Sequence, residues 1–314
     1  MRPRSRLLRN GIEAGLVHLV FTVLRGLPRR ARLSVGRALG SCLYALSSRL
    51  RGMALANLDR AFGDTRTAAE KSRIARRSFA HLGLLLCDSL TFSKADPDHL
   101  EKIALFEGLE HVRAAYARGK GAFVFSGHYG NWEIVALLQG YLRLPLAMVT
   151  RPLDNPHLEK MLHRFRTLSG NRVIHKRGAA REILRAIRQK WGVAIVIDQN
   201  VRGDDGIFVD FFGTPASTTP ALATLALKTD APIVPVFGIP LPDGRYRIRY
   251  LPEVQFQRTG DTRADILTLT QICTGIIEEQ VRREPEFWVW MHRRWRTRPP
   301  ENRAASPAPR EARA

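Results

Sequence analysis

The chain of 314 residues contains few cysteines and no long apolar run. Its three cysteines, Cys42, Cys87 and Cys273, lie far apart, and no cysteine or histidine cluster has the spacing of a zinc site, so we expect no metal. A sparse and odd number of cysteines argues against a disulfide framework and is typical of a reducing compartment. Since no stretch of about 20 uninterrupted apolar residues is present, a conventional membrane-spanning helix is not expected.

Acidic residues are also scarce, with 29 Asp and Glu against 50 Lys and Arg, which gives a formal net charge of +21. Lysine accounts for only 8 of the 50, and residues 1–51 hold 11 arginines and a single acid, Glu13. Such a surface attracts nucleic acid, an anionic membrane or an acidic protein, and charge alone does not choose among them. With 45% hydrophobic residues, the composition excludes wholesale disorder.

Several familiar motifs are missing as well. The chain has no HEXXH, which argues against a zincin, and no Gly-x-Ser-x-Gly around Ser126, which argues against an α/β-hydrolase elbow. It also has no P-loop or GxGxxG at a position where a nucleotide would need one.

The N-terminal segment joins an apolar stretch to basic flanks. Residues 12–24, IEAGLVHLVFTVL, lie between arginine-rich sequences, and no small-residue cleavage site follows them as in a signal peptide. We therefore predict that residues 1–30 form an amphipathic helix in a membrane interface; an ordinary core helix is the alternative. Residues 31–299 are predicted to form one domain, helical over 31–100 and α/β over 101–299, with a disordered tail at 300–314.

Periodicity predicts the fold class. Apolar residues recur at three and four positions through residues 31–92, with a break at Gly63 and a capping box at Thr67 and Glu70. Short apolar runs and helical patterns then alternate, which favours an α/β fold whose mixed, mostly parallel sheet is flanked by helices. The expected strands are 122–126, 146–150, 172–174, 193–198, 233–239 and 246–250. The expected helices are 132–142, 155–168, 178–190, 219–229 and 262–283.

The stretch Gly121–Ile134, GAFVFSGHYGNWEI, carries the strongest chemical signal. A buried strand ends at Ser126, and Asn131 is a good N-cap for a following helix, so His128 lies on the loop at the carboxyl end of the strand. Ligands of open α/β sheets bind at that edge. Glu133, in the first helical turn, could reach the imidazole and make His128 a general base. A helix-capping Asn with a nearby His and Glu is also common without any function.

Other strand ends carry further candidates. Arg151 follows the second strand, where it could contact a phosphate or an oxyanion or form a surface salt bridge. Asp198 and Gln199 end a very apolar strand and are predicted to position the site. Arg164 and Arg166 could contact an anionic headgroup or simply face solvent.

Together these patches resemble the lysophospholipid acyltransferase superfamily, and in particular its lauroyl and myristoyl acyltransferases of lipid A assembly. The resemblance covers residues 10–299 in order. The motifs that resemble the family are His128-x4-Glu133, Asn57-Leu58 with Ala61-Phe62, Val149-Thr-Arg151-Pro with Asn155-Pro, Arg164-Phe-Arg166 with Gly170-Asn171, Asp198-Gln199, Phe211-Phe212-Gly213 with Thr218-Thr219, and Trp290–Pro299.

The resemblance implies acyl transfer from an acyl carrier protein thioester to a hydroxyl of a Kdo-lipid IVA type precursor at the cytoplasmic face of the inner membrane. It implies His128 as general base with Glu133 in support, and substrate contacts by Asn131, Arg151, Asn155, Arg164, Arg166, Asp198 and Gln199. No cofactor is expected beyond the acyl donor, which could also be acyl-CoA. The expected partners are acyl carrier protein, anionic lipids and the glycolipid acceptor.

Three alternatives stay open at this stage. The acceptor could be another glycolipid or phospholipid, such as a phosphatidylinositol mannoside. A lipid-binding relative could have lost catalysis, although both His128 and Glu133 are intact. A nucleic-acid-binding protein is suggested only by the charge, and the dense basic regions flank an apolar segment rather than interleaving with aromatics, so no nucleic acid is expected. The oligomeric state is left open.

Overall fold

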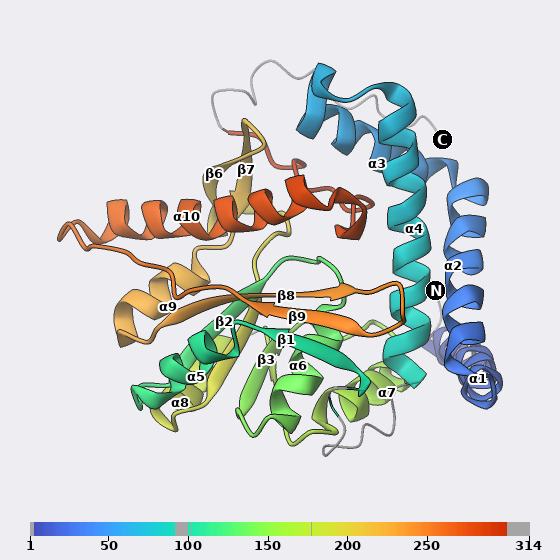
Figure 1. Ribbon diagram of the computed structural model, residues 1–314, viewed down its shortest axis with the longest axis horizontal. Coiled ribbons are helices and arrows are strands. Elements are labelled where there is room, and N and C mark those ends of the chain that lie inside the picture. The colour runs from blue at the N-terminus through green and yellow to red at the C-terminus, as the bar shows by residue number, and fades with distance from the viewer. Residues whose placement is uncertain (1–2, 92–99, 101, 177, 300–314) are drawn as a thin grey trace.

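The computed structural model describes residues 3–91, 100, 102–176 and 178–299 (Figure 1). The helices are α1 (Pro3–Gly26), α2 (Arg29–Leu46), α3 (Ser48–Phe62), α4 (Ala68–Thr91), α5 (Leu109–Ala117), α6 (Trp132–Tyr141), α7 (Pro156–Thr167), α8 (Ala179–Arg188), α9 (Ala221–Thr229) and α10 (Thr262–Arg283). The strands are β1 (Ala104–Glu107), β2 (Ala122–Ser126), β3 (Leu146–Thr150), β4 (Arg172–His175), β5 (Gly192–Val196), β6 (Ile207–Phe211), β7 (Thr214–Thr218), β8 (Ile233–Pro240) and β9 (Tyr246–Tyr250).

The described residues build one seven-stranded sheet in the order β1-β9-β8-β2-β5-β3-β4. Strands β2, β3, β4, β5 and β8 run parallel, while β9 is antiparallel to β8 and carries the edge strand β1 parallel to itself. Strand β2 lies between β8 and β5, and all five of its residues are buried. Because parallel strands end at the same edge, the loops after β2 and β5 emerge side by side.

Helices cover both faces of this sheet, as its continuously apolar strands require. Buried residues of α5, α6 and α7 form one hydrophobic cluster against the sheet. Buried residues of α8, α9 and α10, together with α3 and α4, form the other. In Figure 1 the long helix α10 lies on one side of the sheet, and α5 and α6 lie on the opposite side.

Helices α2 and α4 cross at a distance that requires glycine. A Cβ added to Gly40 would lie 2.0 Å from the backbone oxygen of Phe79, and one added to Gly83 would lie 2.1 Å from that of Gly36. The two backbones therefore touch directly, and any larger residue at the crossing would push α2 away from α4.

Helix α1 has one packed side and one exposed side. Phe21 and Leu24 are buried against Cys87 of α4, with Met161 of α7 packed beside them. Large apolar side chains are nevertheless exposed on α1 and on α2, namely Ile12, Leu16, Leu19, Val20 and Val23, and Val35, Leu39, Leu43 and Leu46. None of the helices in the described part of the chain is both long enough and apolar enough to cross a bilayer.

Much of the predicted architecture is confirmed. The sheet is mixed and mostly parallel, and every expected strand and helix within 101–299 is present with its ends within two residues of the prediction. The break at Gly63 and the Thr67–Glu70 capping box are also present, with the Glu70 carboxylate accepting from the Thr67 amide at 2.8 Å. The proposed domain boundaries stay a prediction, and the tail at 300–314 lies outside the described residues.

The sequence reading missed β1, α5 and the β6–β7 hairpin. Strand β1 is short, at the sheet edge and half exposed, so it lacks the apolar run used to find the others. The hairpin turn is formed by Phe212 and Gly213, both with positive φ, as a type I′ turn requires.

Candidate functional site

His128 lies on the loop of residues 127–131, called here the His128 loop, between β2 and α6. Asn131 caps α6 as predicted, its side-chain oxygen accepting from the Ile134 amide at 3.1 Å. Asp198 follows β5, the parallel neighbour of β2, and so emerges at the same sheet edge. A Cβ on Gly127 would lie 2.9 Å from an Asp198 carboxylate oxygen, which shows how closely the two loops approach.

The carboxylate that reaches the imidazole is Asp198. Its Oδ1 lies 2.7 Å from Nδ1 of His128, and its Oδ2 accepts from the His128 amide and from the Trp288 indole, each at 2.7 Å. Burial alone would raise the pKa of Asp198, but the charge and hydrogen bond of His128 outweigh it and hold that pKa well below its usual range. An ionised Asp198 accepts from Nδ1–H and leaves Nε2 of His128 as the basic nitrogen.

The predicted contact between Glu133 and His128 is replaced by a different pairing. Glu133 accepts two hydrogen bonds from Arg166, at 2.9 Å to Nε and 2.5 Å to Nη2, and both side chains are only 11% exposed. Burial lowers the pKa of Arg166, but the Glu133 carboxylate raises it above its usual value overall, so the guanidinium stays charged. The helical register explains the difference: Glu133 lies in the first turn of α6 and faces Arg166 of α7, whereas Asp198 follows the neighbouring strand β5.

A pocket of about 1610 Å³ opens beside these two pairs and is lined by His128, Glu133 and Arg166. That volume exceeds the roughly 300–1,000 Å³ typical of small-molecule sites. Part of its wall is apolar, from Ile183, Ala194, Ile195, Ile197 and Leu225. Its basic lining side chains are Arg151, Arg166, Lys176, Arg181 and Arg202. The pocket therefore combines an apolar wall with a cationic lining, which suits a ligand with both kinds of surface.

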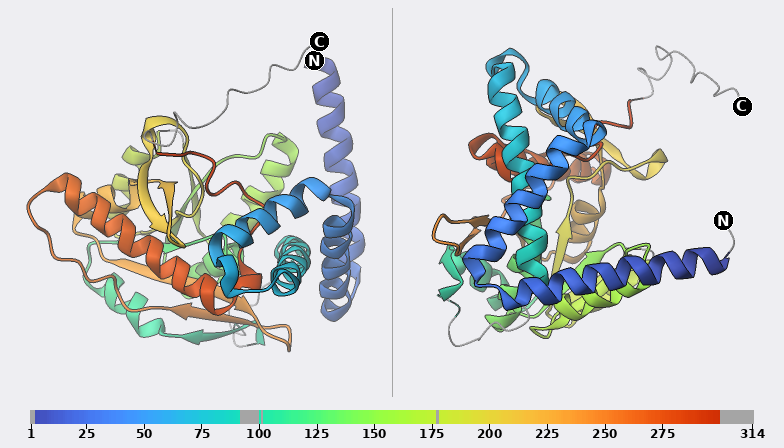
Figure 2. Two further views of the ribbon diagram at one scale, coloured as in Figure 1. Left: turned by 90° about the horizontal axis from the view of Figure 1, so that it is seen from above. Right: turned by 90° about the vertical axis from the view of Figure 1, so that its right-hand side faces the viewer.

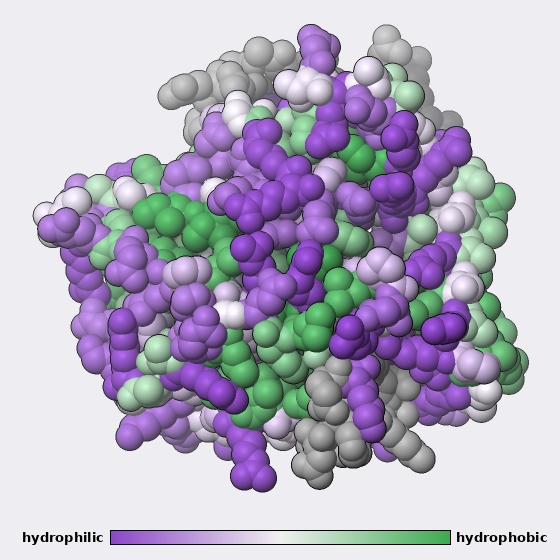
Figure 3. Space-filling model, viewed as in Figure 1, coloured by the Kyte–Doolittle hydropathy of each residue, from purple (hydrophilic) through white to green (hydrophobic). Residues whose placement is uncertain are grey.

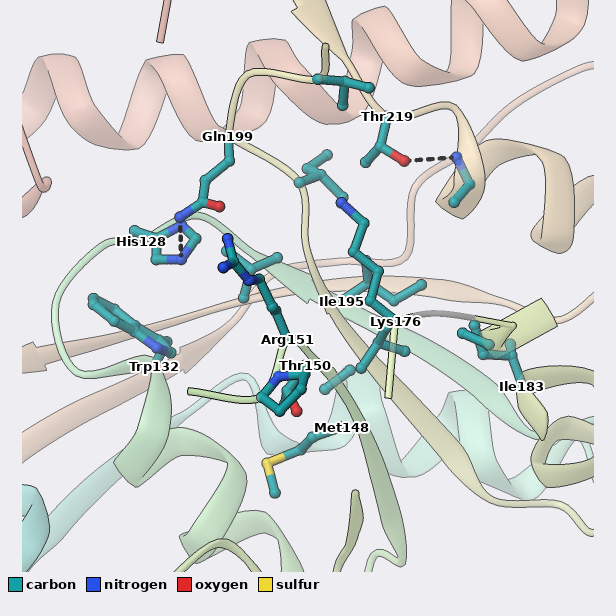
Figure 4. A pocket seen from close by; sticks show the side chains of 18 of the residues that line it. His128, Trp132, Met148, Thr150, Arg151, Lys176, Ile183, Ile195, Gln199 and Thr219 are labelled. Carbon is teal, nitrogen blue, oxygen red and sulfur yellow. Dashed lines mark hydrogen bonds between the residues drawn. The ribbon is translucent and has the colours of Figure 1, made fainter. Parts of the chain in front are cut away.

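Two of the remaining predicted residues line the pocket. The Gln199 amide lies 3.1 Å from Nε2 of His128 (Figure 4). Arg151 points toward the same region in Figure 4, although its exposed guanidinium is bonded at 3.1 Å to the exposed Asp154. Both residues are therefore placed where a substrate at His128 would meet them.

The other three do not line it. Asn131, the last residue of the His128 loop, is fully buried. Asn155 caps α7, and its amide donates to the Asn10 backbone oxygen of α1 at 2.9 Å. Arg164 is exposed and does not line the pocket, so it faces solvent, as the second of the two alternatives had it. The sequence could not separate Arg164 from Arg166, since both occupy the last turn of one helix.

A buried aromatic segment closes the site from behind. Trp288 and Trp290 are fully buried, and the Val289 amide donates to the His128 backbone oxygen at 3.0 Å. Arg294 and Trp295, which follow these tryptophans, are also buried in the core. Burial lowers the pKa of His292 to about 4 despite the nearby Asp198 charge, so its ring is neutral.

Sequence reasoning missed Trp288, which lies two residues before the Trp290 motif and donates to Asp198 across 90 positions. It also missed the lining cations Lys176, Arg181 and Arg202. No local pattern marks these contacts; an aromatic before a known motif and basic residues after predicted strands were the only signals.

The comparisons with known proteins agree with one another. Residues 1–297 match the family model described as bacterial lipid A biosynthesis acyltransferase. The chain is 25% identical over 275 residues to the lipid A biosynthesis palmitoleoyltransferase of Escherichia coli K12, covering 87% of each chain. It is 24% identical over 291 residues to a lipid A biosynthesis acyltransferase of Haemophilus influenzae, covering 92% of this chain and 88% of that one. A phosphatidylinositol mannoside acyltransferase of Mycobacterium tuberculosis is 25% identical over 203 residues, covering 63% of this chain and 62% of that one.

Proposed function

Because the chain belongs to the bacterial lipid A biosynthesis acyltransferase family, and is thus an O-acyltransferase, we propose that it moves an acyl chain from acyl carrier protein to a hydroxyl of a Kdo-lipid IVA type precursor. The observation that carries this proposal is the His128 imidazole, held at Nδ1 by Asp198, beside a large pocket with apolar and cationic walls.

The proposed reaction is a direct transfer without an acyl-enzyme. Nε2 of His128 takes the proton of the acceptor hydroxyl as its oxygen attacks the thioester carbonyl, and Asp198 stabilises the resulting imidazolium. The tetrahedral intermediate collapses with loss of the carbon–sulfur bond, and the imidazolium returns the proton to the departing thiolate. None of the three cysteines lines the pocket: Cys87 and Cys273 are buried, and Cys42 lies on α2.

The developing oxyanion needs a donor. The backbone amide of Asn131 already donates to the Gly238 oxygen at 2.7 Å, so we favour Arg151 as this donor. The Gln199 amide, 3.1 Å from Nε2 of His128, joins Arg151 when the substrate hydroxyl takes its place at Nε2. The Glu133–Arg166 pair then has a separate role: Glu133 holds the Arg166 guanidinium at the pocket wall, where it contacts an anionic part of the substrate. Phosphates of the acceptor would meet Lys176, Arg181 and Arg202 in the same way.

The donor is proposed to be acyl carrier protein because the enzyme is strongly basic and carrier proteins are acidic. Opposite charges of this kind speed encounter more than they tighten binding, and salt screens them. The apparent second-order rate constant should therefore fall with ionic strength when the thioester is on the carrier protein. With acyl-CoA as donor the dependence should be weaker.

We further propose that the enzyme lies on the cytoplasmic face of the inner membrane through α1 and α2. The exposed apolar side chains of the two helices lie on the same outer side: Figure 2 (right) has both helices in front, and Figure 3 has hydrophobic residues along the edge where they lie in Figure 1. Exposed Arg30 and Arg37 are placed on α2 near these side chains. Apolar residues beside arginines fit an anionic lipid surface.

The test is acylation of defined acceptors by the purified full chain in detergent, followed by mass spectrometry. We expect Kdo-lipid IVA to gain one acyl group from acyl carrier protein, and His128→Ala to abolish the gain. His163→Ala, an exposed histidine on α7, is the control and should keep full activity. Transfer that survives in His128→Ala would sink the mechanism. Acylation of a phosphatidylinositol mannoside but not of Kdo-lipid IVA would identify that glycolipid as the acceptor. Binding of duplex DNA in competition with lipid would support the nucleic-acid hypothesis.

A further inference from the structure

A chain of buried polar side chains lies directly behind the His128 loop. Asn131 Nδ2 donates to the Tyr246 hydroxyl at 3.0 Å, and that hydroxyl donates to Asp88 Oδ2 at 2.6 Å. Arg29 closes the chain with hydrogen bonds to both Asp88 oxygens, at 2.8 and 3.3 Å. Asn131, Tyr246 and Asp88 are each no more than 1% exposed. Four segments distant in sequence thus meet in one network.

Helix α4 makes two more contacts with the loop. The Ser89 hydroxyl donates to Asn131 Oδ1 at 3.2 Å, and His81 Nε2 lies 3.0 Å from the Gly130 backbone oxygen. His81, Asp88 and Ser89 are seven and eight positions apart, so they lie on one face of α4. Helix α4 therefore contacts the last two residues of the loop, Gly130 and Asn131.

In this network of buried side chains, each hydrogen bond has only one possible donor and one possible acceptor. The Asp88 carboxylate, paired with Arg29, only accepts, so the single hydroxyl proton of Tyr246 goes to Asp88. Burial and the Asp88 charge raise the pKa of Tyr246 well above its usual value, so the hydroxyl keeps this proton. Its oxygen is then an acceptor, which turns the Asn131 amide so that Nδ2 faces Tyr246 and Oδ1 faces the start of α6. The Arg29–Asp88 pair thereby favours the same orientation of Asn131 as the Ile134 amide, which can only donate to Oδ1.

We propose that Tyr246 and Asp88 are positioning residues for acyl transfer, which hold the His128 loop in the one conformation that presents the imidazole to the pocket. The inference rests on the proposed function for its kinetic consequence, but the conformation of the loop can be measured without any reaction. Neither residue lines the pocket, so their effect passes through Asn131 and the loop backbone.

Strand β9 supplies a matched control for the test. Tyr250 lies four residues after Tyr246, is equally buried, and donates its hydroxyl to Gln139 at 3.2 Å rather than to the network. Tyr246→Phe and Tyr250→Phe each delete one buried hydroxyl from the same strand, so a general loss of stability would affect both alike.

The experiment compares the two full-length variants by hydrogen–deuterium exchange of peptides covering 127–134 and by steady-state kinetics. We expect exchange in these peptides to rise about tenfold in Tyr246→Phe and to stay at the wild-type rate in Tyr250→Phe. We expect kcat to fall about tenfold with KM unchanged in the first variant only, since a small misplacement of the base slows the chemical step. Asp88→Asn keeps the shape of the side chain but removes the charge that orients the hydrogen bonds of Tyr246 and Asn131. It should also raise the exchange rate of the peptides covering 127–134.

Equal exchange in both tyrosine variants would overturn the inference, as would an unchanged kcat in Tyr246→Phe. The exchange measurement decides the question even where the wild-type enzyme acylates none of the acceptors tested. A wild-type enzyme that acylates none of the acceptors would contradict only the proposed function, not the positioning role of Tyr246 and Asp88.

Discussion

The sheet edge and the N-terminal helices depart from the usual burial pattern in opposite ways. At the sheet edge, polar side chains including Asn131 and Asp198 are buried among apolar neighbours. On α1 and α2 the reverse holds: these helices carry nine of the fourteen exposed large apolar side chains in the described part of the chain. Buried polar groups and exposed apolar patches are the informative exceptions to burial, and functional sites are where such exceptions gather. The contrast separates the proposed chemistry at the sheet edge from the proposed lipid contact at α1 and α2.

The largest effect should come from Asp198→Asn. An amide at this position offers Nδ2 as well as oxygen to the imidazole, so the tautomer is no longer fixed and the imidazolium loses its counter-charge. We expect kcat to fall about 10²–10⁴-fold, as for other histidine bases that lose a carboxylate. Binding to vesicles, measured by co-sedimentation, should not change. Weakened vesicle binding would break the separation between the two regions.

The helices provide the reciprocal test. In the double variant Leu16→Gln and Leu39→Gln, α1 and α2 each lose one exposed apolar side chain. Vesicles of phosphatidylglycerol and phosphatidylcholine should bind it about 100-fold more weakly, or about 3 kcal/mol if each leucine contributes about half its full burial energy. Turnover in detergent should be unchanged.

The matched control is Leu105→Gln with Leu267→Gln, two leucines of similar exposure on β1 and α10. Vesicle binding of this control should equal that of the wild type. If control and test variants lose binding equally, general hydrophobicity rather than the α1–α2 surface drives the association.

The buried His81 of α4 should make the free energy of unfolding depend on pH. Burial lowers the pKa of His81 to about 4, against the 6.5 of an unfolded chain. Between these values the unfolded chain binds a proton that the folded chain does not, so stability is present above about pH 6.5 and is lost as pH falls toward 4. At pH 5 the loss due to His81 should be roughly 2 kcal/mol.

Urea unfolding at pH 7 and pH 5 measures this loss. His81→Gln, which stays neutral and can still donate to Gly130, should show a smaller drop than the wild type by that amount. His163→Gln, an exposed control, should match the wild type. A wild-type stability that is flat between pH 7 and pH 5 would contradict a neutral, buried His81.

The smallest effect is expected from Glu133→Gln, the isosteric counterpart of Asp198→Asn. The amide leaves the buried Arg166 without its counter-ion, so we expect a KM for the acceptor about tenfold higher and a kcat near wild type. If Glu133 supported the imidazole, as the sequence spacing first suggested, kcat would fall as far as in Asp198→Asn. Steady-state kinetics of the two variants side by side decides between these roles.

The sequence by itself determined the local elements. Buried strands such as residues 122–126 are short apolar runs, and Asn131 precedes its helix, so period and capping located them without tertiary information. The position of His128 at a strand end followed from the same pattern. The apolar pattern of a strand and the cap of a helix are local features of the chain, which a sequence records directly.

Only the tertiary structure decided the partners of the charged groups. Asp198 reaches His128 across 70 positions and Asp88 reaches Tyr246 across 158, because strand order and helix packing bring them together. Glu133, the acid nearest to His128 in sequence, is turned by its helix toward Arg166. A helix or strand turns each side chain by its own period, so nearness along the chain predicts the element that carries a residue but not the group that the residue meets.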